Sequence, residues 1–402
     1  MSVESARLPR VSEFPDSARP PHSATQATGL RHRLAELRGP DTPPRPMDAR
    51  ALAALAANPG CNRRALLDGA GVDKGRIADA LGSPAAFGQS QFALTRGNAF
   101  EARVKADGGA ELLRLVHACV GGADDAEPVP GLVRNPDLSA IGPEGRTART
   151  ALALREAVES AAADGTWAFL DHPMLALDVA GSPAFLEPDA VVVHPDGSWT
   201  VVEIKSFPMI DGAADASKVG AAARQAAVYV LALEQVAARM PEAGVTVRDR
   251  IVLVCPKDFT NLPAASAVDV RKQRAVTRRQ LTRLTRIDDI AEALPPGTVF
   301  DPELSPDALT AAVEAVPATY APECLAACEL AFHCRDRSRA AGAVTTLGRP
   351  LRAELGGLTT VDAVLAAAHG EAGDPADPTV AALRRAAALR AEALAGAGAG
   401  SR

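Results

Sequence analysis

Apolar positions along the chain alternate between helical spacing and short continuous runs. Residues 91–120 carry apolar side chains at helical spacing, which predicts one long amphipathic helix. Other helices are predicted over residues 48–58, 146–163 and 216–238. Shorter apolar runs predict strands over residues 174–179, 185–194, 199–206, 250–255 and 267–270. This order of helix, three-strand meander, helix and strand predicts a mixed α/β core.

The ends of the chain differ from this core. Residues 1–47 are rich in proline and arginine, which predicts mostly disorder with one short helix over 32–38. We place the core domain at residues 48–340. Residues 341–402 predict a helical C-terminal extension. The expected fold class is therefore α/β, a mixed sheet flanked by helices, with helical additions at both ends.

Composition limits the cellular setting and the mode of binding. No apolar run approaches the roughly 20 residues that span a bilayer, and the first residues lack the apolar segment of a signal peptide. We therefore expect a cytoplasmic protein with no membrane partner. The net charge is −6, and a nucleic-acid partner would need a local basic patch. Aromatic residues make up only 3% of the chain, so base-stacking platforms are not evident.

Two carboxylates and one lysine are predicted to meet at an edge of the sheet. In the run Val201-Val202-Glu203-Ile204-Lys205, alternate side chains share a strand face, so Glu203 and Lys205 project together. The turn at Pro195-Asp196-Gly197 folds the preceding strand back beside them, and Asp189 lies on that strand. Charges in so apolar a strand need partners or a metal.

This trio suits phosphodiester hydrolysis. Carboxylate oxygens are hard ligands that favour Mg²⁺ or Mn²⁺, which polarise a phosphate and acidify water. Lys205 is a compact cation that can orient the attacking water and offset negative charge. The other interpretation is a solvated Glu203–Lys205 pair on an edge strand, with Asp189 closing a turn.

The motifs Pro188-Asp189 and Glu203-Ile204-Lys205 resemble the two signature pieces of the PD-(D/E)xK nuclease superfamily. Gln225 and Tyr229 lie one helical turn apart and resemble the extra motif of its RecB-like branch. Glu101 matches the place of a further metal ligand in that branch. The resemblance covers residues 60–340 and implies a restriction-endonuclease-like core, in which Asp189, Glu203 and Glu101 bind the metal. It also implies that Gln225 and Tyr229 support catalysis.

One early cysteine and three late ones flank the predicted core. They are Cys61, Cys324, Cys328 and Cys334. This pattern resembles the iron–sulfur nucleases of the RecB-like branch, including CRISPR-associated and AddB-type exonucleases, and it implies a [4Fe–4S] cluster. The spacing of the last three departs from the family's by one residue. Four thiolates suit Zn²⁺ equally well. Cys119 and Cys255 lie in apolar segments and are expected to be inert.

A basic stretch follows the last predicted strand. It contains no acidic residue and seven basic ones: Arg271, Lys272, Arg274, Arg278, Arg279, Arg283 and Arg286. Such a face can hold phosphates by bidentate hydrogen bonds, although a merely solvated helix face is the alternative.

The sequence thus predicts a metal-dependent deoxyribonuclease. The family resemblance favours exonuclease-like action on single strands or DNA ends, in repair or phage defence, with a helicase or defence-complex subunit as a possible partner. The alternatives are a catalytically silent DNA-binding or scaffolding subunit and a zinc-stapled interaction protein without a nucleic-acid role.

Overall fold

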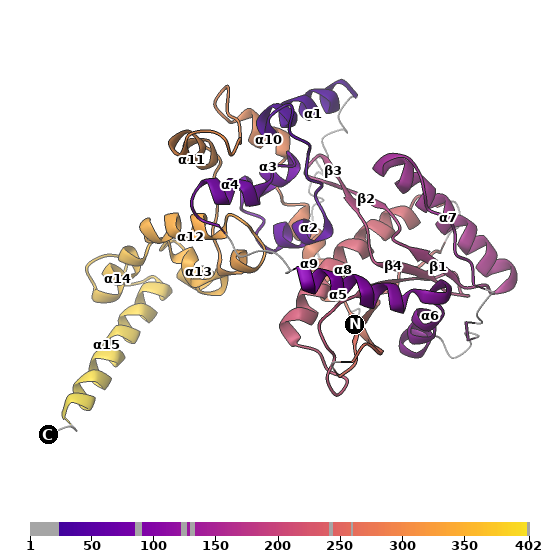
Figure 1. The fold of residues 1–402 in the computed structure, drawn as a ribbon. Coiled ribbons are helices and arrows are strands. Elements are labelled where there is room, and N and C mark those ends of the chain that lie inside the picture. The colour runs from indigo at the N-terminus through magenta and orange to yellow at the C-terminus, as the bar shows by residue number, and fades with distance from the viewer. Residues whose placement is uncertain are drawn as a thin grey trace, which may run out of the picture.

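The computed structural model describes residues 24–84, 91–121, 127–128, 133–240, 244–258 and 260–399. A five-stranded sheet forms its centre, in the order β1-β4-β5-β6-β7 (Figure 1). Strands β5 and β6 pair in parallel and the other neighbours are antiparallel, so the sheet is mixed. The strands are β1 (Ala168–Asp171), β4 (Ala190–Val193), β5 (Trp199–Ile204), β6 (Arg250–Pro256) and β7 (Pro263–Asp269).

A separate hairpin of β2 (Leu175–Val179) and β3 (Ser182–Leu186) lies outside the main sheet. The predicted strand over 185–194 is therefore wrong in extent, because Glu187–Asp189 separate β3 from β4. The expected three-strand meander is accordingly two hairpins, and β1 was not predicted. The pair β4–β5 and its turn match the expectation, with Gly197 at φ 77° in the turn.

Helices surround the sheet and continue beyond it. They are α1 (Ala24–Arg38), α2 (Ala49–Ala57), α3 (Asn62–Gly69), α4 (Lys74–Ala80), α5 (Gln91–Val104), α6 (Ala106–Val120), α7 (Gly142–Asp164), α8 (Ala216–Ala237), α9 (Arg271–Leu281), α10 (Ile287–Glu292), α11 (Pro306–Glu314), η1 (Pro322–Ala326), α12 (Ala331–Ala340), η2 (Val344–Leu347), α13 (Arg349–Leu355), α14 (Val361–His369) and α15 (Pro378–Ala399).

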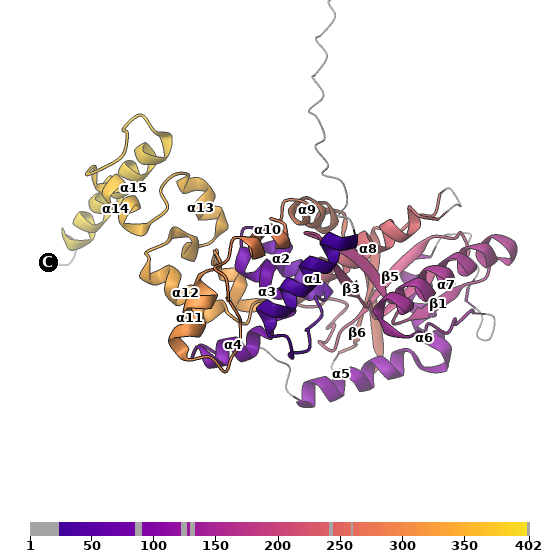
Figure 2. The ribbon, with the colours of Figure 1, turned by 90° about the horizontal axis from the view of Figure 1, so that it is seen from above.

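The single helix expected over residues 91–120 is two helices. Asp107, Gly108 and Gly109 all have positive φ, which breaks the helical path between α5 and α6. The break directs α6 across the sheet while α5 continues past its edge (Figure 2).

Each face of the sheet has its own apolar core. Val202, Ile204 and Val252 pack with residues of α5 and α6. Val201 and Leu253 point the other way, into a larger core shared with α8 and α2. The alternation expected for β5 is thereby confirmed, and Glu203 lies on the α8 side of the sheet.

A helical lobe joins the two ends of the chain. Residues 1–23 lie outside the described part, but α1 begins at Ala24 and buries Leu34 and Leu37. The short helix expected over residues 32–38 is therefore present, within a longer helix that begins at Ala24. Leu37 accepts a backbone hydrogen bond from Phe300 at 2.7 Å, and α3 packs against α10.

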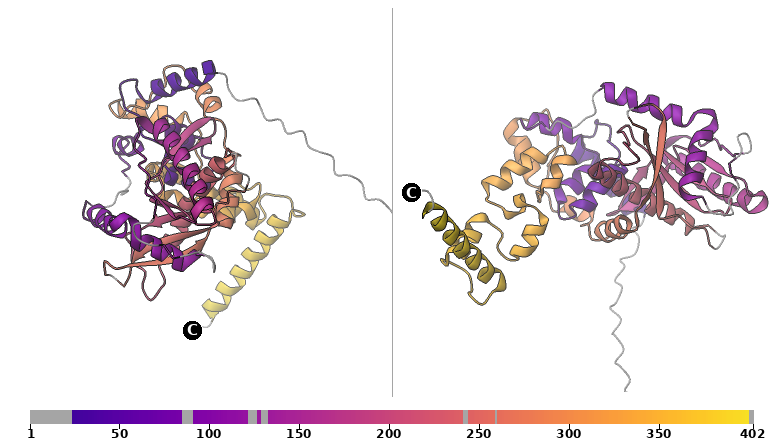
Figure 3. Two further views of the ribbon diagram at one scale, coloured as in Figure 1. Left: turned by 90° about the vertical axis from the view of Figure 1, so that its right-hand side faces the viewer. Right: turned by 90° about the horizontal axis from the view of Figure 1, so that it is seen from below.

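Helices α13–α15 form an arm that extends away from the sheet (Figures 1 and 3). Among the helices described, none is long and apolar enough to cross a membrane.

Candidate active site

The β4–β5 hairpin brings Asp189 to Glu203. Ala190 lies opposite Val202, so Asp189 is placed at the next position of the ladder, beside Glu203. The Oδ2 atom of Asp189 accepts the backbone N–H of Ile204 at 2.6 Å, which fixes the carboxylate at the end of β5. Burial raises the pKa of Asp189, whereas Lys205 and this hydrogen bond oppose the rise.

Lys205 links the two carboxylates. Its ammonium donates to the Oε1 atom of Glu203 and lies 3.8 Å from the Oδ2 atom of Asp189. Burial lowers the pKa of Lys205, but the two carboxylates outweigh it, so the net pKa is raised and the side chain stays protonated. The predicted trio therefore converges, within the sheet and not on a solvated edge.

Glu203 is fully buried, at 0% exposure, between β4 and β6. Burial raises its pKa to about 7, and the negative charges of Asp189 and Glu101 add to the rise. Its Oε2 atom has no hydrogen-bond partner among the residues described. An ionised carboxylate in this position is costly without a further positive charge or donor.

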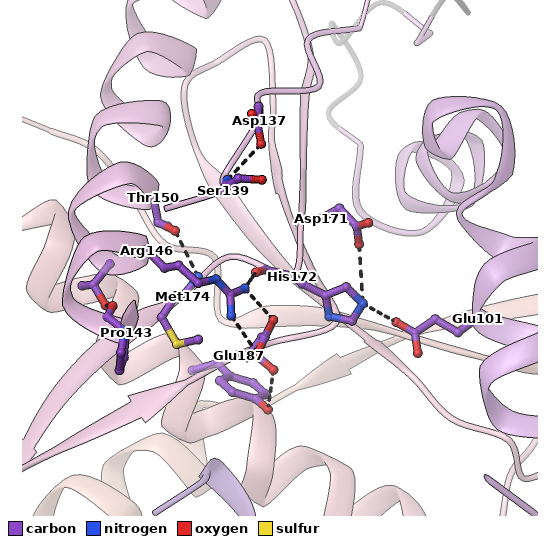
Figure 4. Close-up of polar contacts among 12 residues, drawn as sticks. Glu101, Asp137, Ser139, Pro143, Arg146, Thr150, Asp171, His172, Met174 and Glu187 are labelled. Carbon is purple, nitrogen blue, oxygen red and sulfur yellow. Dashed lines mark hydrogen bonds and ion pairs between the residues drawn. The ribbon is translucent and has the colours of Figure 1, made fainter. Parts of the chain in front are cut away.

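Glu101 extends the site from α5. Its Oε1 atom contacts the Nζ atom of Lys105 at 2.5 Å and the Nε2 atom of His172 at 3.0 Å. The hydrogen bond from His172 is the largest cause of a pKa lowered to about 2 for Glu101. Lys105 also lies 2.7 Å from Asp171. Figure 4 shows His172 pointing toward both Glu101 and Asp171.

Lys105, Asp171 and His172 form part of the site that the sequence analysis missed. Lys105 is four residues after Glu101. This spacing predicts a helical ion pair, so the contact could have been predicted from the sequence. Asp171 and His172 end the unpredicted strand β1. His172 has φ 47°, a strained backbone for a residue other than glycine, and such strain often occurs at functional sites.

Gln225 and Tyr229 lie on α8, over the same face of the sheet. Gln225 donates to the hydroxyl of Tyr229 at 3.1 Å, and that hydroxyl donates to the carbonyl of Glu187 at 3.2 Å. Burial and the charges of Glu203 and Asp189 raise the pKa of Tyr229, so it stays a neutral donor. The pair therefore fixes the chain just before Asp189.

Arg146 of α7 holds the same segment from the other side. Its guanidinium contacts Glu187 Oε1 at 2.6 Å and donates to the carbonyl of His172 at 3.0 Å (Figure 4). Glu187 and His172 lie on chain segments that flank the acidic site, so Arg146 ties these segments together.

The carboxylates are partnered by lysines as the structure stands. Within the described parts of the chain, no three His, Cys, Asp or Glu side chains converge closely enough to hold a single metal ion. At the acidic site, Lys205 lies between Asp189 and Glu203, and Lys105 lies between Glu101 and Asp171.

The four predicted cysteines lie near one another between the N-terminal and C-terminal helices, but among the described residues no three of them are close enough to hold a single metal ion. Cys61 precedes α3; burial raises the pKa of Cys324 and Cys334, and the nearby Cys61 side chain adds to the rise. Cys334 in turn raises the pKa of Cys328, which burial brings to about 12. All four are free thiols.

Hydrogen bonds between distant segments hold this cysteine group. Asn58 donates to the Thr319 carbonyl at 2.6 Å and to the Cys324 thiol at 3.4 Å. Arg63 donates to the Cys334 thiol at 3.3 Å, and Arg64 donates to the Ala327 carbonyl. These donors oppose the effect of burial, but the net pKa of Cys324, Cys328 and Cys334 is raised, which favours the neutral thiols.

The other two cysteines lie elsewhere. Cys255 is buried in β6, where burial raises its pKa to about 12, and Cys119 is half-buried in α6. His333 is buried next to Cys334, and burial lowers its pKa.

The predicted basic stretch forms α9 and the turn after it. Glu234 and Asp249 contact Arg274, and Glu234 also contacts Arg278. Two further arginines pair with their own neighbours, Arg271 with Asp269 and Arg286 with Asp288. Over the described residues, Lys272, Arg279 and Arg283 form no ion pair, and all three are exposed.

Comparisons with known proteins give no further guidance: no protein-family profile, no curated protein and no solved structure matches the chain.

Proposed function

We propose that this protein is a metal-dependent nuclease that hydrolyses phosphodiester bonds in DNA. The observation that carries the proposal is the buried Oε2 atom of Glu203, which no donor among the described residues reaches. A buried carboxylate oxygen needs a proton, a donor or a cation. With Asp189 and Lys205 close by, a metal cation is the partner that would let this oxygen take part in catalysis.

Asp189 and Glu203 are the residues that would hold the metal. Their oxygen donors suit Mg²⁺ or Mn²⁺, and Glu101 is near enough to raise the pKa of both. When bound, the cation supplies Lewis acidity, which polarises the phosphate and acidifies water.

The protein's own residues would position the reactants. Lys205 stays protonated, so its ammonium can orient water and offset negative charge on the phosphate. Gln225 and Tyr229 act as positioning residues, because they hold the Glu187 carbonyl two residues before Asp189. The pair Lys105 and His172 fixes Glu101 at the rim of the site.

The finer assignment follows from the motifs. We place the chain in the RecB-like branch of the PD-(D/E)xK superfamily, with a restriction-endonuclease-like core acting on single strands or DNA ends. Cys61, Cys324, Cys328 and Cys334 would hold a [4Fe–4S] cluster, with Zn²⁺ as the alternative. A helicase or defence-complex subunit is the partner that this assignment suggests.

A catalytically silent DNA-binding or scaffolding subunit is the second candidate. It is favoured by one observation, namely that the ammonium groups of Lys105 and Lys205 already contact the site's carboxylates. The two proposals differ in whether a divalent cation can enter.

Cleavage assays separate the two candidates. Anaerobically purified full-length protein is incubated with end-labelled single-stranded DNA, double-stranded DNA and RNA, with Mn²⁺ or with EDTA. We expect Mn²⁺-dependent DNA cleavage that EDTA abolishes. Absence of cleavage, together with intact DNA binding, would assign the chain to the silent class.

A further inference from the structure

A cavity of about 380 Å³ opens where the C-terminal arm joins the body. Its walls come from α12, η2, α13 and the segment that follows α11. The short helix η2 contacts both α12 and α13 at this junction. The volume lies in the range of small-ligand pockets. None of Glu101, Asp189 and Glu203 lines it, so it is separate from the candidate active site.

The charged groups of the cavity are all positive. Arg63 from α3, Arg337 from α12 and Arg352 from α13 line it, and none of its described lining residues is Asp or Glu. Arg352 is exposed, and its side chain has no hydrogen bond or ion pair within the described residues. Arg337 contacts Glu314 through Nε. Arg352 is therefore the arginine of this wall without a partner among the described residues, and a wall with no lining carboxylate favours an anionic ligand.

Arg63 is held rigidly in the wall. It is 7% exposed, donates to the Val316 carbonyl at 3.2 Å and to the Cys334 thiol at 3.3 Å. Cys334 itself lines the cavity. A preorganised arginine loses little side-chain freedom on binding, which strengthens recognition.

Hydroxyl groups complete the lining. Thr319, Ser338, Thr345 and Thr359 face the cavity, together with the nearly buried Tyr320. Arginine forks combined with hydroxyl donors are the usual contacts of proteins with phosphate oxygens.

We propose that this cavity is a binding site for the phosphate group of a nucleotide, distinct from the candidate active site. The phosphate contacts Arg337 and Arg352 and lies against Arg63. The ligand is either a free nucleoside monophosphate or the phosphorylated end of a nucleic-acid strand, which share this chemistry. The cavity shares Arg63 and Cys334 with the cysteine group, and the inference stands whether or not the protein cleaves DNA.

Isothermal titration calorimetry on the full-length protein tests the site, in EDTA so that no strand is hydrolysed. The probes are dAMP, deoxyadenosine, and one oligodeoxynucleotide with either a 5′-phosphate or a 5′-hydroxyl. We expect phosphate-bearing probes to bind and deoxyadenosine to fail. Stronger binding of the 5′-phosphorylated strand than of dAMP identifies a strand end as the natural ligand, and the reverse order identifies a free nucleotide.

Arginine variants locate the binding. Arg352→Ala removes an exposed, unpaired group and should weaken dAMP binding at least about tenfold, the usual effect of losing a charged hydrogen bond. Arg352→Glu should weaken it further. Arg385→Ala, an exposed arginine of α15 outside the cavity, is the matched control and should leave binding unchanged. Failure of every phosphate-bearing probe to bind, or equal affinity in an Arg337→Ala/Arg352→Ala double variant, would overturn the proposal.

Discussion

The Nζ atom of Lys105 lies 2.5 Å from the Oε1 atom of Glu101, and only 8% of the lysine side chain is exposed. The same nitrogen reaches Asp171 at 2.7 Å. A single buried cation therefore joins the helix on one face of the sheet to the end of β1. We expect this contact to set both the charge of the site and part of its stability.

Replacement of Lys105 by methionine tests that role. The change leaves Glu101 and Asp171 without their shared cation, so the pKa of Glu101 should rise from about 2 toward its ordinary value. We expect a loss of about 1–2 kcal/mol in the free energy of unfolding, less than for a fully buried pair because water screens both acids. Urea denaturation measures the loss. Arg103→Met, at an exposed position of α5, is the control and should change stability little.

Lys205 offers the direct test of catalysis. Lys205→Met should abolish Mn²⁺-dependent cleavage, because no other ammonium bridges Asp189 and Glu203 within the described residues. Lys257→Met removes an exposed lysine at the end of β6 and should cleave at the normal rate. Circular dichroism checks that both variants fold. Normal cleavage by Lys205→Met would remove this residue from the proposed mechanism.

The raised pKa of Glu203 predicts a pH dependence of stability. Its pKa is about 7 in the folded protein and near 4.5 when unfolded, so between these values the folded state holds the extra proton. Metal-free protein should therefore lose stability as pH rises from about 4.5 to 7, by up to about 3 kcal/mol. The Glu203→Gln side chain cannot ionise, so the free energy of unfolding of this variant should not show this fall with pH. Parallel slopes for the two proteins across that window would contradict the buried, protonated state.

The basic residues of α9 and the turn after it fall into two groups, those that form no ion pair with any described residue and those that are paired with a carboxylate. Replacing Lys272, Arg279 and Arg283 together by alanine should reduce the slope of log affinity for DNA against log salt by about two to three, because each lost phosphate contact releases fewer counterions. Replacing Arg274 and Arg278 instead should mainly reduce stability, since both pair with Glu234. Fluorescence anisotropy over a range of salt concentrations compares the variants. An unchanged slope in the triple variant would mean that this helix is only solvated.

The cysteine group predicts a bound metal. It also predicts that the Cys61 and Cys334 variants lose stability to the same extent. Anaerobic protein should be brown and contain about four irons per chain. Cys61→Ser and Cys334→Ser should both lose the colour and destabilise the C-terminal helices equally, as either change opens the same link. Cys119→Ala is the control and should keep the colour. Colourless protein with one zinc would identify the other metal, and metal-free protein as stable as wild type would dismiss the site.

The parts of the site that follow from local pattern could be predicted from the sequence. A turn at Pro195–Gly197 between alternating strands fixes the register that places Asp189 beside Glu203. Gln225 and Tyr229 are likewise one turn apart on a helix. These relationships depend on residues that are close in sequence, which is why spacing alone was enough.

Relationships between distant segments could not be predicted in this way. His172 meets Glu101 from the segment that follows β1, a strand that the apolar pattern did not predict. Arg274 and Arg278 of α9 looked free in the sequence, but both pair with Glu234, some 40 positions earlier. In both cases a contact between distant segments determines which side chains pair, and the local sequence pattern does not indicate that contact.

The pairing of the two ends of the chain has a consequence for its synthesis. Helices α1 and α3 contact α10 and are bonded to Phe300, Pro317 and Ala327, while α2 packs against α8 and α9. A ribosome adding about 5–20 residues per second needs on the order of ten to fifty seconds to extend the chain from Ala80 to Cys334. Throughout that interval Leu52, Leu66 and their neighbours have no complete core to enter. Nascent chains that stall before Cys334 should therefore bind chaperones and aggregate, even though the β4–β5 hairpin is already complete.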